Sequence, residues 1–474
     1  MHSHRAAFAV ALLAVLVAPL QAQRSKRPVT TAPAPPAAVA RLNVLVEAFT
    51  LPNGLRVVLS RDTTAPTVGV GVYYKVGFRT EPRDRTGFAH LFEHLMFQGS
   101  KNLGKLQFVK LIENNGGILN GSTRFDFTNY YEVVPSHVLE PILWAEADRM
   151  RGLAIDQSNL DNQRDVVKNE VRVNVTNQPY GSFPWIDLPM TANTNWANAH
   201  DFYGDFKDLD AATLENATAF FRTYYAPNNA ALAVVGDFDP AQARAWIAKY
   251  FADIPRSDAP SPPDVMEPRQ SVERRHSRVD SLANRPALGV AWHVPPRWTA
   301  EWFAFGIIDQ ILAQGRDSRL VDKLVLQKSL TGDVSAGINW GLGNQFNYEG
   351  PMLWELSMYH DVGTPAQALL DAIDQEVELL RTRLVDAPTL ARAKTKMRSQ
   401  LYDAVDGQSG LGKLDLLASF ALFDGDPARL NAVEKNFDAV SPALILSTAK
   451  EWLRRENRTV YTIVPGAKTP GGAP

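Results

Sequence analysis

Hydrophobic positions along the chain follow two spacings, and these predict alternating strands and helices. Continuous apolar runs, typical of buried strands, occupy residues 68–74 and 287–293. Apolar residues fill residues 88–97 and 214–225 at lengths and spacings typical of helices, and a more polar segment, 160–175, keeps only a few apolar positions. This alternation predicts an α+β fold in which each sheet is mainly antiparallel and is covered on one face by helices.

The same order of elements occurs twice. Each copy begins with one of the two apolar strands and continues into an apolar helix, which ends at Gln98-Gly99 in the first copy and at Gln314-Gly315 in the second. Each copy also closes with a helix and a strand, at 214–235 and at 444–464. The pattern therefore predicts two homologous domains that arose by duplication.

Domain boundaries are indicated by changes in composition. The segment from Pro255 to Asp264 has four prolines, which cannot continue a helix or a central strand, so we expect an interdomain linker there. The predicted parts are a signal peptide at 1–22, a disordered tether at 23–42, an N-terminal catalytic domain at 43–254, a linker at 255–270, a C-terminal non-catalytic domain at 271–465 and a tail at 466–474.

The first 22 residues have the pattern of a secretory signal. A charged start that ends at Arg5 precedes an apolar core at 6–18, and the sequence predicts cleavage after Ala22. The core is short for a membrane span and the chain has no cysteine to carry a lipid, so we expect a periplasmic or secreted protein without stable membrane insertion. An uncleaved anchor is the alternative.

Charge and composition exclude several classes of function. The 49 Lys and Arg residues nearly balance the 51 Asp and Glu residues, and without a strong basic run we expect no nucleic-acid partner. The absence of cysteine excludes disulfides and thiol chemistry. The glycine-rich run Gly407–Gly412 does not follow a strand and has no phosphate-loop lysine, so it predicts a turn between helices and not a nucleotide site.

The motif H-x-x-E-H at residues 90–94 is the main candidate for chemistry. On a helix, His90 and His94 lie on one face with Glu93 beside them, and a catalytic zinc ion needs three protein ligands. Glu170, on the polar helix downstream, can supply the third ligand. The surrounding residues 88–97 are apolar, so burying these polar groups without a metal would be costly. The alternative interpretation is an amphipathic helix with surface histidines.

The second copy lacks these residues. When the two Gln-Gly pairs are aligned, the positions of the motif are taken by Gly306, Asp309 and Gln310. The second domain is therefore predicted to keep the apolar helix and to have no metal site. The histidines at positions 137, 200, 276, 293 and 360 have no companion at ligand spacing, and we assign them no role.

Several segments together resemble one peptidase family. They are Gly87–Phe97, Gly116–Thr123 with Tyr130-Tyr131, the helix that leads to Glu170, Tyr224–Ala230 and Val234–Asp237. In these segments the chain resembles the pitrilysin, or M16, family of zinc peptidases, which includes insulin-degrading enzyme and the mitochondrial processing peptidase. The resemblance implies an α/β roll in each domain, Zn²⁺ held by His90, His94 and Glu170, and Glu93 as the general base.

Two positions depart from the family pattern. The family usually has a second glutamate seven residues before the third ligand. This chain has Gln163 there, so the resemblance implies that the residues supporting the metal ligands carry one charge fewer. The family also usually reads Asn-Ala where this chain reads Asn120-Gly121. The resemblance places Asn120 and Gly121 on the strand that pairs with substrate. Independently, residues 118–123 have the composition of an edge strand that can bind an extended peptide, and an ordinary edge strand with a polar rim is the alternative.

The expected function is that of a zinc-dependent endopeptidase that hydrolyses peptides or unfolded polypeptides with metal-activated water. The alternative is a non-catalytic or partner-dependent subunit of a heterodimeric peptidase. The resemblance implies that two such two-domain units face each other, so a homodimer or a heterodimer with a homologous subunit is expected.

Overall fold

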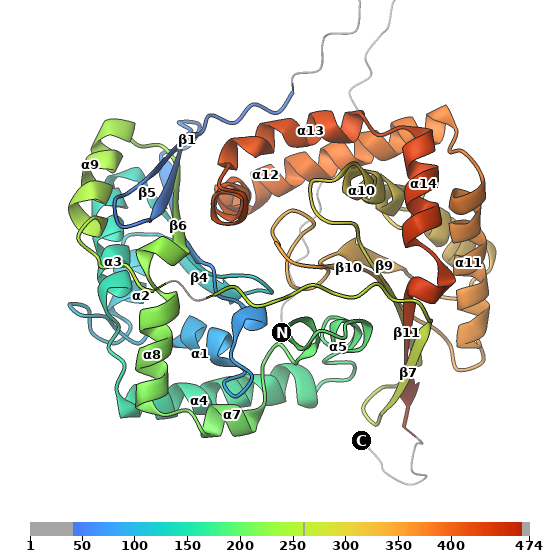
Figure 1. Ribbon diagram of the computed structural model, residues 1–474, viewed down its shortest axis with the longest axis horizontal. Helices are drawn as coiled ribbons and strands as arrows, with labels where there is room; N and C mark the ends of the chain where they lie inside the picture. Colours follow the sequence, from blue (N-terminus) through green and yellow to red (C-terminus); the bar gives the residue numbers. More distant parts are fainter. Residues whose placement is uncertain (1–40, 259–260, 467–474) are drawn as a thin grey trace, which may run out of the picture. The chain divides into compact units, whose positions relative to one another are not determined.

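The first of two sheets has six strands in the spatial order β1-β2-β6-β3-β5-β4. Four of them, β1, β4, β5 and β6, are labelled in Figure 1. The strands are β1 Glu47–Thr50, β2 Arg56–Arg61, β3 Thr67–Tyr74, β4 Ile118–Thr123, β5 Thr128–Pro135 and β6 Ala230–Gly236. β2 and β6 are parallel, and every other neighbouring pair is antiparallel. The computed structural model describes residues 41–258 and 261–466.

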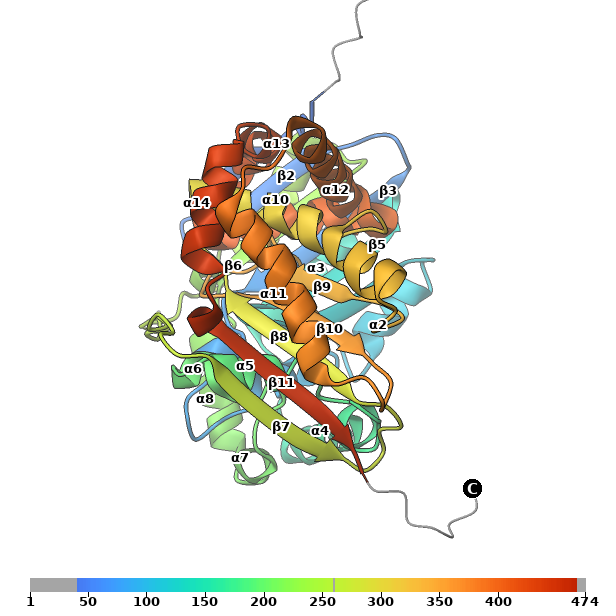
Figure 2. The same cartoon turned by 90° about the vertical axis from the view of Figure 1, so that its right-hand side faces the viewer.

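The second sheet repeats this plan with five strands in the order β7-β11-β8-β10-β9 (Figure 2). They are β7 Arg274–Asp280, β8 Ala287–His293, β9 Ser335–Ile338, β10 Leu353–Tyr359 and β11 Arg458–Pro465. The one parallel pair, β7 and β11, takes the place of β2 and β6. The predicted fold class, two related halves with mainly antiparallel sheets and helices, is confirmed.

Helices pack on both sheets. Those between β3 and β7 are α1 Phe88–Leu95, α2 Gln107–Glu113, α3 Leu139–Arg151, α4 Gln157–Val171, α5 Asp187–Ala192, α6 Trp196–Ala199, α7 Phe206–Asp210, α8 Leu214–Tyr224 and α9 Pro240–Phe251. Those after β8 are α10 Ala300–Leu312, α11 Ala366–Thr382, α12 Ala387–Asp424, α13 Leu430–Asp438 and α14 Pro442–Trp452. Short 3₁₀ turns lie at Phe78–Thr80, Ser136–Val138, Pro227–Asn229, Pro427–Arg429 and Arg455–Asn457, and π-helical turns at Arg172–Thr176 and Val321–Gln327.

The prediction of a turn at Gly407–Gly412 is wrong, because α12 continues through this run to Asp424. The helix is not straight there. A Cβ on Gly412 would lie 2.0 Å from the carbonyl oxygen of Ala404, whereas residues eight apart in a straight helix are about 12 Å apart along the axis. The glycines permit this close backbone approach, and packing on either side keeps both parts of the helix in place.

The second part of α12 crosses to the first sheet and covers the face that the helices of the first half leave open. Side chains of β3 alternate: Val70 and Val72 face the first half's own helices, whereas Gly69 and Gly71 open the other face. Leu414 of α12 fills this opening, since a Cβ on Gly71 would lie 2.5 Å from its Cδ2 atom. The expectation that helices cover only one face of this sheet is therefore wrong.

The first half makes the reciprocal contribution to the second sheet. Phe183, just before α5, and Leu188, in α5, pack against β8. A Cβ on Gly289 of β8 would lie 2.8 Å from the Phe183 ring and 3.2 Å from Leu188. The other face of this sheet is covered by α10, α11 and α14, and these helices belong to the largest hydrophobic core. Each sheet is thus sandwiched between helices of its own half and a segment of the other half.

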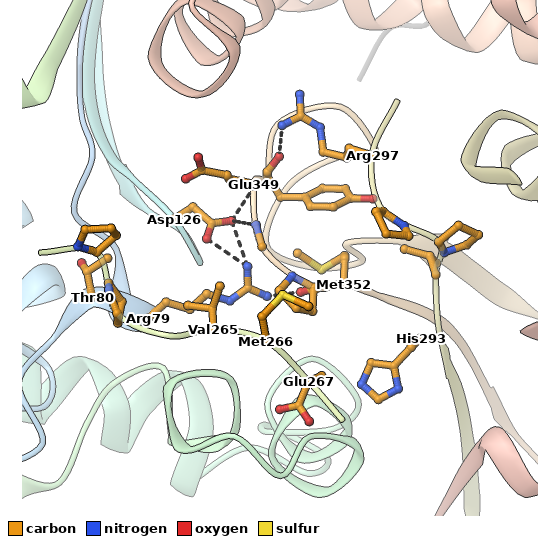
Figure 3. A pocket seen from close by; sticks show the side chains of 18 of the residues that line it. Arg79, Thr80, Asp126, Val265, Met266, Glu267, His293, Arg297, Glu349 and Met352 are labelled. Atoms are coloured by element: carbon orange, nitrogen blue, oxygen red, sulfur yellow. Dashed lines mark hydrogen bonds and ion pairs between the residues drawn. The ribbon is translucent and has the colours of Figure 1, made fainter. Parts of the chain in front are cut away.

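A buried ion pair of the first half contacts the second half at a cavity of about 590 Å³ (Figure 3). The Arg79 guanidinium donates to both carboxylate oxygens of Asp126, at 2.9 and 3.0 Å, and also to the carbonyl oxygen of Pro351. Asp126 in turn accepts from the backbone N–H of Glu349 at 2.8 Å. The segment that links the two sheets, residues 261–270, lines the same cavity. This polar contact therefore fixes the loop before β10 against the first half.

Within residues 41–258 and 261–466, no helix has the length and apolarity that a membrane crossing requires. The predicted signal peptide at 1–22, all but the last two residues of the tether and nearly all of the predicted tail at 466–474 lie outside the described residues. The two sheets fall on either side of 255–270, and the exact domain boundaries stay a prediction.

The ion pair at the junction gives a test of stability. Asp126→Ala leaves the Arg79 charge buried without a counter-charge, and breaking a buried pair in this way costs about 3 to 5 kcal/mol of unfolding free energy. We expect a clear fall in the urea midpoint of the variant. Asp84→Ala, which removes a carboxylate that is 77% exposed, is the control and should leave the midpoint nearly unchanged. Equal midpoints for the two variants would show that the junction does not depend on this pair.

Candidate metal centre and active site

The N-terminus of α1 is fixed by a buried carboxylate. Glu81 accepts from the backbone N–H groups of Gly87 at 2.8 Å and Ala89 at 2.6 Å, two of the groups that a helix start leaves without partners. Burial raises the pKa of Glu81, although His200, 3.6 Å away, opposes this. Gly87 has φ +82°, and a Cβ there would lie 2.5 Å from the Tyr203 carbonyl oxygen. The start of α1 is therefore held tightly against its neighbours.

The structure brings together the three residues that the sequence predicts as metal ligands. His90 and His94 lie one turn apart on α1, Glu170 lies near the end of the adjacent α4, and their candidate ligand atoms are all within 4.8 Å of one another. Nε2 of His94 lies 3.1 Å, and Nε2 of His90 3.6 Å, from the Glu170 carboxylate. Two imidazole nitrogens and one carboxylate oxygen form the donor set of a catalytic zinc site, so the residues fit this ion.

The charges of this cluster favour a cation. Burial, assisted by the nearby His94, lowers the pKa of His90 to about 4, so its imidazole is neutral near pH 7, as a metal ligand must be. Burial acts to raise the pKa of Glu170, but the hydrogen bond from His94 and the charges of the two histidines hold it below its ordinary value. Glu170 is therefore a carboxylate at neutral pH.

Glu93 lies beside the cluster, between α1 and the edge strand of the first sheet. Its carboxylate accepts from Oγ1 of Thr123 at 2.8 Å. Burial raises the pKa of Glu93, against the effect of that hydrogen bond. A Cβ on Gly121 would lie 3.2 Å from Cγ of Glu93, so the strand lies directly against this side chain. A carboxylate with a raised pKa, next to candidate metal ligands, has the properties of a general base.

The strand that contacts Glu93 is β4, which is the outermost strand of its sheet, as predicted. It pairs with β5 on one side only, and Asn120 is exposed. The backbone N–H of Gly121 donates to Oδ1 of Asn120 at 2.9 Å. This side chain therefore accepts the hydrogen bond of one backbone N–H group in β4. The edge is thus open to pairing with another strand once that side-chain bond is exchanged.

Residues that the sequence analysis did not identify complete the pocket. It has a volume of about 380 Å³ and is lined by His90, Glu93, Ser122, Thr123, Arg124, Glu170, Trp185, Phe202, Tyr203, Trp340, Gly341 and Leu342. Tyr203 donates its hydroxyl to Glu170 at 3.4 Å. Residues 340–342 come from the second half. Tyr203 and these three residues are far from the motif in the sequence, so no pattern of residue spacing could have connected them with it.

Gln163 lies on α4 two turns before Glu170 and is buried. Its side-chain amide donates to Asn162 at 2.8 Å, and no hydrogen bond joins it to His90 or His94 in the part of the chain that the structure describes. A role of Gln163 beside the ligands stays a prediction.

Comparisons with known proteins match most of this chain to one peptidase family. Residues 56–187 match the family described as Insulinase (Peptidase family M16), and residues 211–397 match the Peptidase M16 inactive domain. A protein named Zinc protease PqqE from Helicobacter pylori is 26% identical over 88% of this chain and 93% of its own length. The beta subunit of the mitochondrial processing peptidase of Saccharomyces cerevisiae is 22% identical over 76% of this chain and 79% of its own length.

Solved structures share the fold. The crystal structure of a protease from Helicobacter pylori superposes with a TM-score of 0.81 and 25% identity, covering 89% of this chain and all of that one. The periplasmic protease PqqL from Escherichia coli superposes with a TM-score of 0.72 and 17% identity, and 90% of this chain covers 48% of that protein. From the matched families, the relatives and the shared two-sheet architecture, we conclude that this chain belongs to the M16, or insulinase, family of peptidases.

Proposed function

We propose that the protein is a zinc-dependent endopeptidase that cleaves peptides or unfolded polypeptides. The observation that carries the proposal is the convergence of His90, His94 and Glu170 next to Glu93, directly beneath an open edge strand. The relatives named zinc proteases support the choice of metal. A zinc ion held by these three residues would polarise the scissile carbonyl and make water more acidic.

The residues of the chain supply the proton transfers. Glu93 accepts a proton from the attacking water and returns it to the amine that leaves. Thr123 keeps the Glu93 carboxylate in place through its hydrogen bond, and the raised pKa of Glu93 brings its proton affinity closer to what a base needs at neutral pH. Because water is the nucleophile, no covalent intermediate with the protein forms.

The edge strand selects extended substrates. A polypeptide that adds to β4 as a further strand makes backbone hydrogen bonds and places its peptide bonds over Glu93. The N–H of Gly121 then exchanges Oδ1 of Asn120 for a substrate carbonyl. Backbone pairing recognises an extended shape before it recognises side chains, so unfolded segments are the expected substrates.

A second candidate function is that of a subunit that works only with a homologous partner. Some relatives are named as subunits of the mitochondrial processing peptidase and of the cytochrome b-c1 complex. The second half has Gly306, Asp309 and Gln310 in place of the motif, so the described residues of one chain contain one candidate site. We propose that this chain, with domains at 43–254 and 271–465, forms a homodimer or a heterodimer with such a subunit.

We place the protein in the periplasm or outside the cell. The signal-like sequence from Met1 to Ala22 supports this. A neighbour of the same fold is described as a periplasmic protease.

Glu93→Gln tests the general base. The amide cannot accept the proton, so we expect kcat to fall by at least about a hundredfold, while zinc content by elemental analysis stays at the wild-type value. Glu113→Gln, an exposed position on α2, is the matched control and should keep full activity. Wild-type turnover by the Glu93 variant would refute the assignment.

Tyr203→Phe tests how the third ligand is positioned. Without the hydroxyl, Glu170 loses a hydrogen bond that orients it, and the loss of such an outer contact typically weakens metal binding by about ten- to a hundredfold. Zinc affinity would be measured by competition with a chromophoric chelator. Tyr180→Phe, whose hydroxyl bonds to the loop at Asn284 and Arg285, is the control. Unchanged affinity in Tyr203→Phe would show that the tyrosine does not support the site.

A further inference from the structure

Arg124 is a cation at the end of the edge strand, and its charge acts on Glu93 and Asp415. It follows Thr123, the residue that donates to Glu93, and lies in the short connection from β4 to β5. Its backbone is fixed, because its N–H donates to the Phe127 carbonyl at 2.8 Å and its own carbonyl accepts from Phe78 at 3.2 Å. The fold therefore fixes the position of the Arg124 backbone, from which the side chain extends.

The Arg124 side chain lines two neighbouring pockets. One is the 380 Å³ pocket that contains His90, Glu93 and Glu170. The other, of about 320 Å³, is polar and lies between the first sheet and α12, with Asp415 on its wall. Ser122 and Arg124 belong to both pockets, so these two residues mark the place where the pockets meet along β4.

The guanidinium of Arg124 has unused hydrogen-bonding capacity. It carries five N–H donors, and among the described residues the side chain makes no hydrogen bond and no ion pair within 4.0 Å, although its charge acts on Glu93 and Asp415. The large buried arginines behave differently: Arg79 and Arg297 both bond to carboxylates and to backbone carbonyls.

The nearby acids are already engaged. Glu93 accepts from Thr123, and Asp415 accepts from the Tyr73 hydroxyl at 2.9 Å and from Asn347 at 3.0 Å. The Arg124 guanidinium is half-buried where two pockets meet, and no described residue accepts from its N–H donors. A planar guanidinium in this situation can bind a carboxylate through two parallel hydrogen bonds.

We infer that Arg124 is a specificity-determining residue, which selects substrates that carry a carboxylate close to the scissile peptide bond. This inference rests on the proposed function. When a substrate strand lies along β4, its side chains alternate between the two faces, so a residue near the bond over Glu93 can reach Arg124. The carboxylate comes either from an Asp or Glu side chain or from the C-terminus of a short peptide.

Binding of labelled peptides to the full-length protein tests the inference without requiring turnover. Fluorescence anisotropy with zinc-loaded Glu93→Gln protein would compare an amidated peptide containing Asp and Glu with its Asn and Gln counterpart, and a neutral peptide with a free or an amidated C-terminus. We expect one of the carboxylate forms to bind about tenfold more tightly, a difference of about 1.4 kcal/mol, because hydrogen bonds between two charged groups are the stronger ones. The pair that shows the preference identifies the source of the carboxylate.

The variants decide whether Arg124 causes the preference. Arg124→Gln in the same background should abolish it, and Arg124→Lys, which keeps the charge and loses the fork, should reduce it. Arg61→Gln, an exposed arginine on β2 that lines neither pocket, removes the same charge elsewhere and should leave the preference intact. Thermal unfolding would verify that each variant is folded.

Two results would overturn the inference: equal binding of all four peptides by the protein with Arg124 intact, or a preference that survives Arg124→Gln. The proposed function fails separately, when zinc-loaded protein with Glu93 intact binds peptides and does not cleave them. Cleavage assays with the same peptides therefore distinguish the two failures, since a lost binding preference leaves turnover of neutral peptides in place.

Discussion

The structure depends on an exchange of covering segments between its halves. Glycines open one face of β3 and of β8, and in each case the apolar side chains that fill the opening come from the other half, Leu414 in one direction and Phe183 in the other. Apolar burial of this kind is the main favourable contribution to folding. Because each sheet completes its second face with the other half's residues, the largest hydrophobic core contains residues of both halves, beside a second core that belongs to the first half alone.

The same exchange brings the second half to the site. Asp415, on the part of α12 that lies over the first sheet, accepts from Tyr73 below it and from Asn347 in the loop between β9 and β10. That loop carries Trp340 and Leu342 into the pocket beside the histidines. The candidate site thus takes its floor and its candidate ligands from the first half and one wall from the second half. The contacts of Arg79 and Asp126 with the loop before β10 fix that wall against the first half.

Comparison of the two halves shows that an acid at the same helix position can line a pocket or be buried in a core. Asp309, aligned with Glu93, is fully buried and accepts from the Trp354 indole at 2.6 Å. Burial raises the pKa of Asp309 to about 6, with the Trp354 hydrogen bond opposing it. Glu93 instead lies under an open strand edge. The acid of the second half has become part of a core, whereas that of the first half still lines a pocket.

Local patterns predicted much of the fold and the centre of the site, but not its surroundings. His90 and His94 were recognisable because one helix fixes their spacing, and β4 and β8 have the bounds that their residues indicated. The glycine run in α12 was misread because glycine weakens a helix locally, whereas packing on the first sheet decides its conformation. Tyr203 and Trp340 reach the site only through tertiary packing, which no short window of sequence contains.

The crossing of α12 also sets an order of events during synthesis. The strands of the first sheet leave the ribosome long before α12, because β7 to β10 and the helices α10 and α11 are made in between. Until then the face around Gly69 and Gly71 lacks its cover, and exposed apolar surface of this kind is prone to aggregation. The first sheet can therefore bury this face only after α12 has been made.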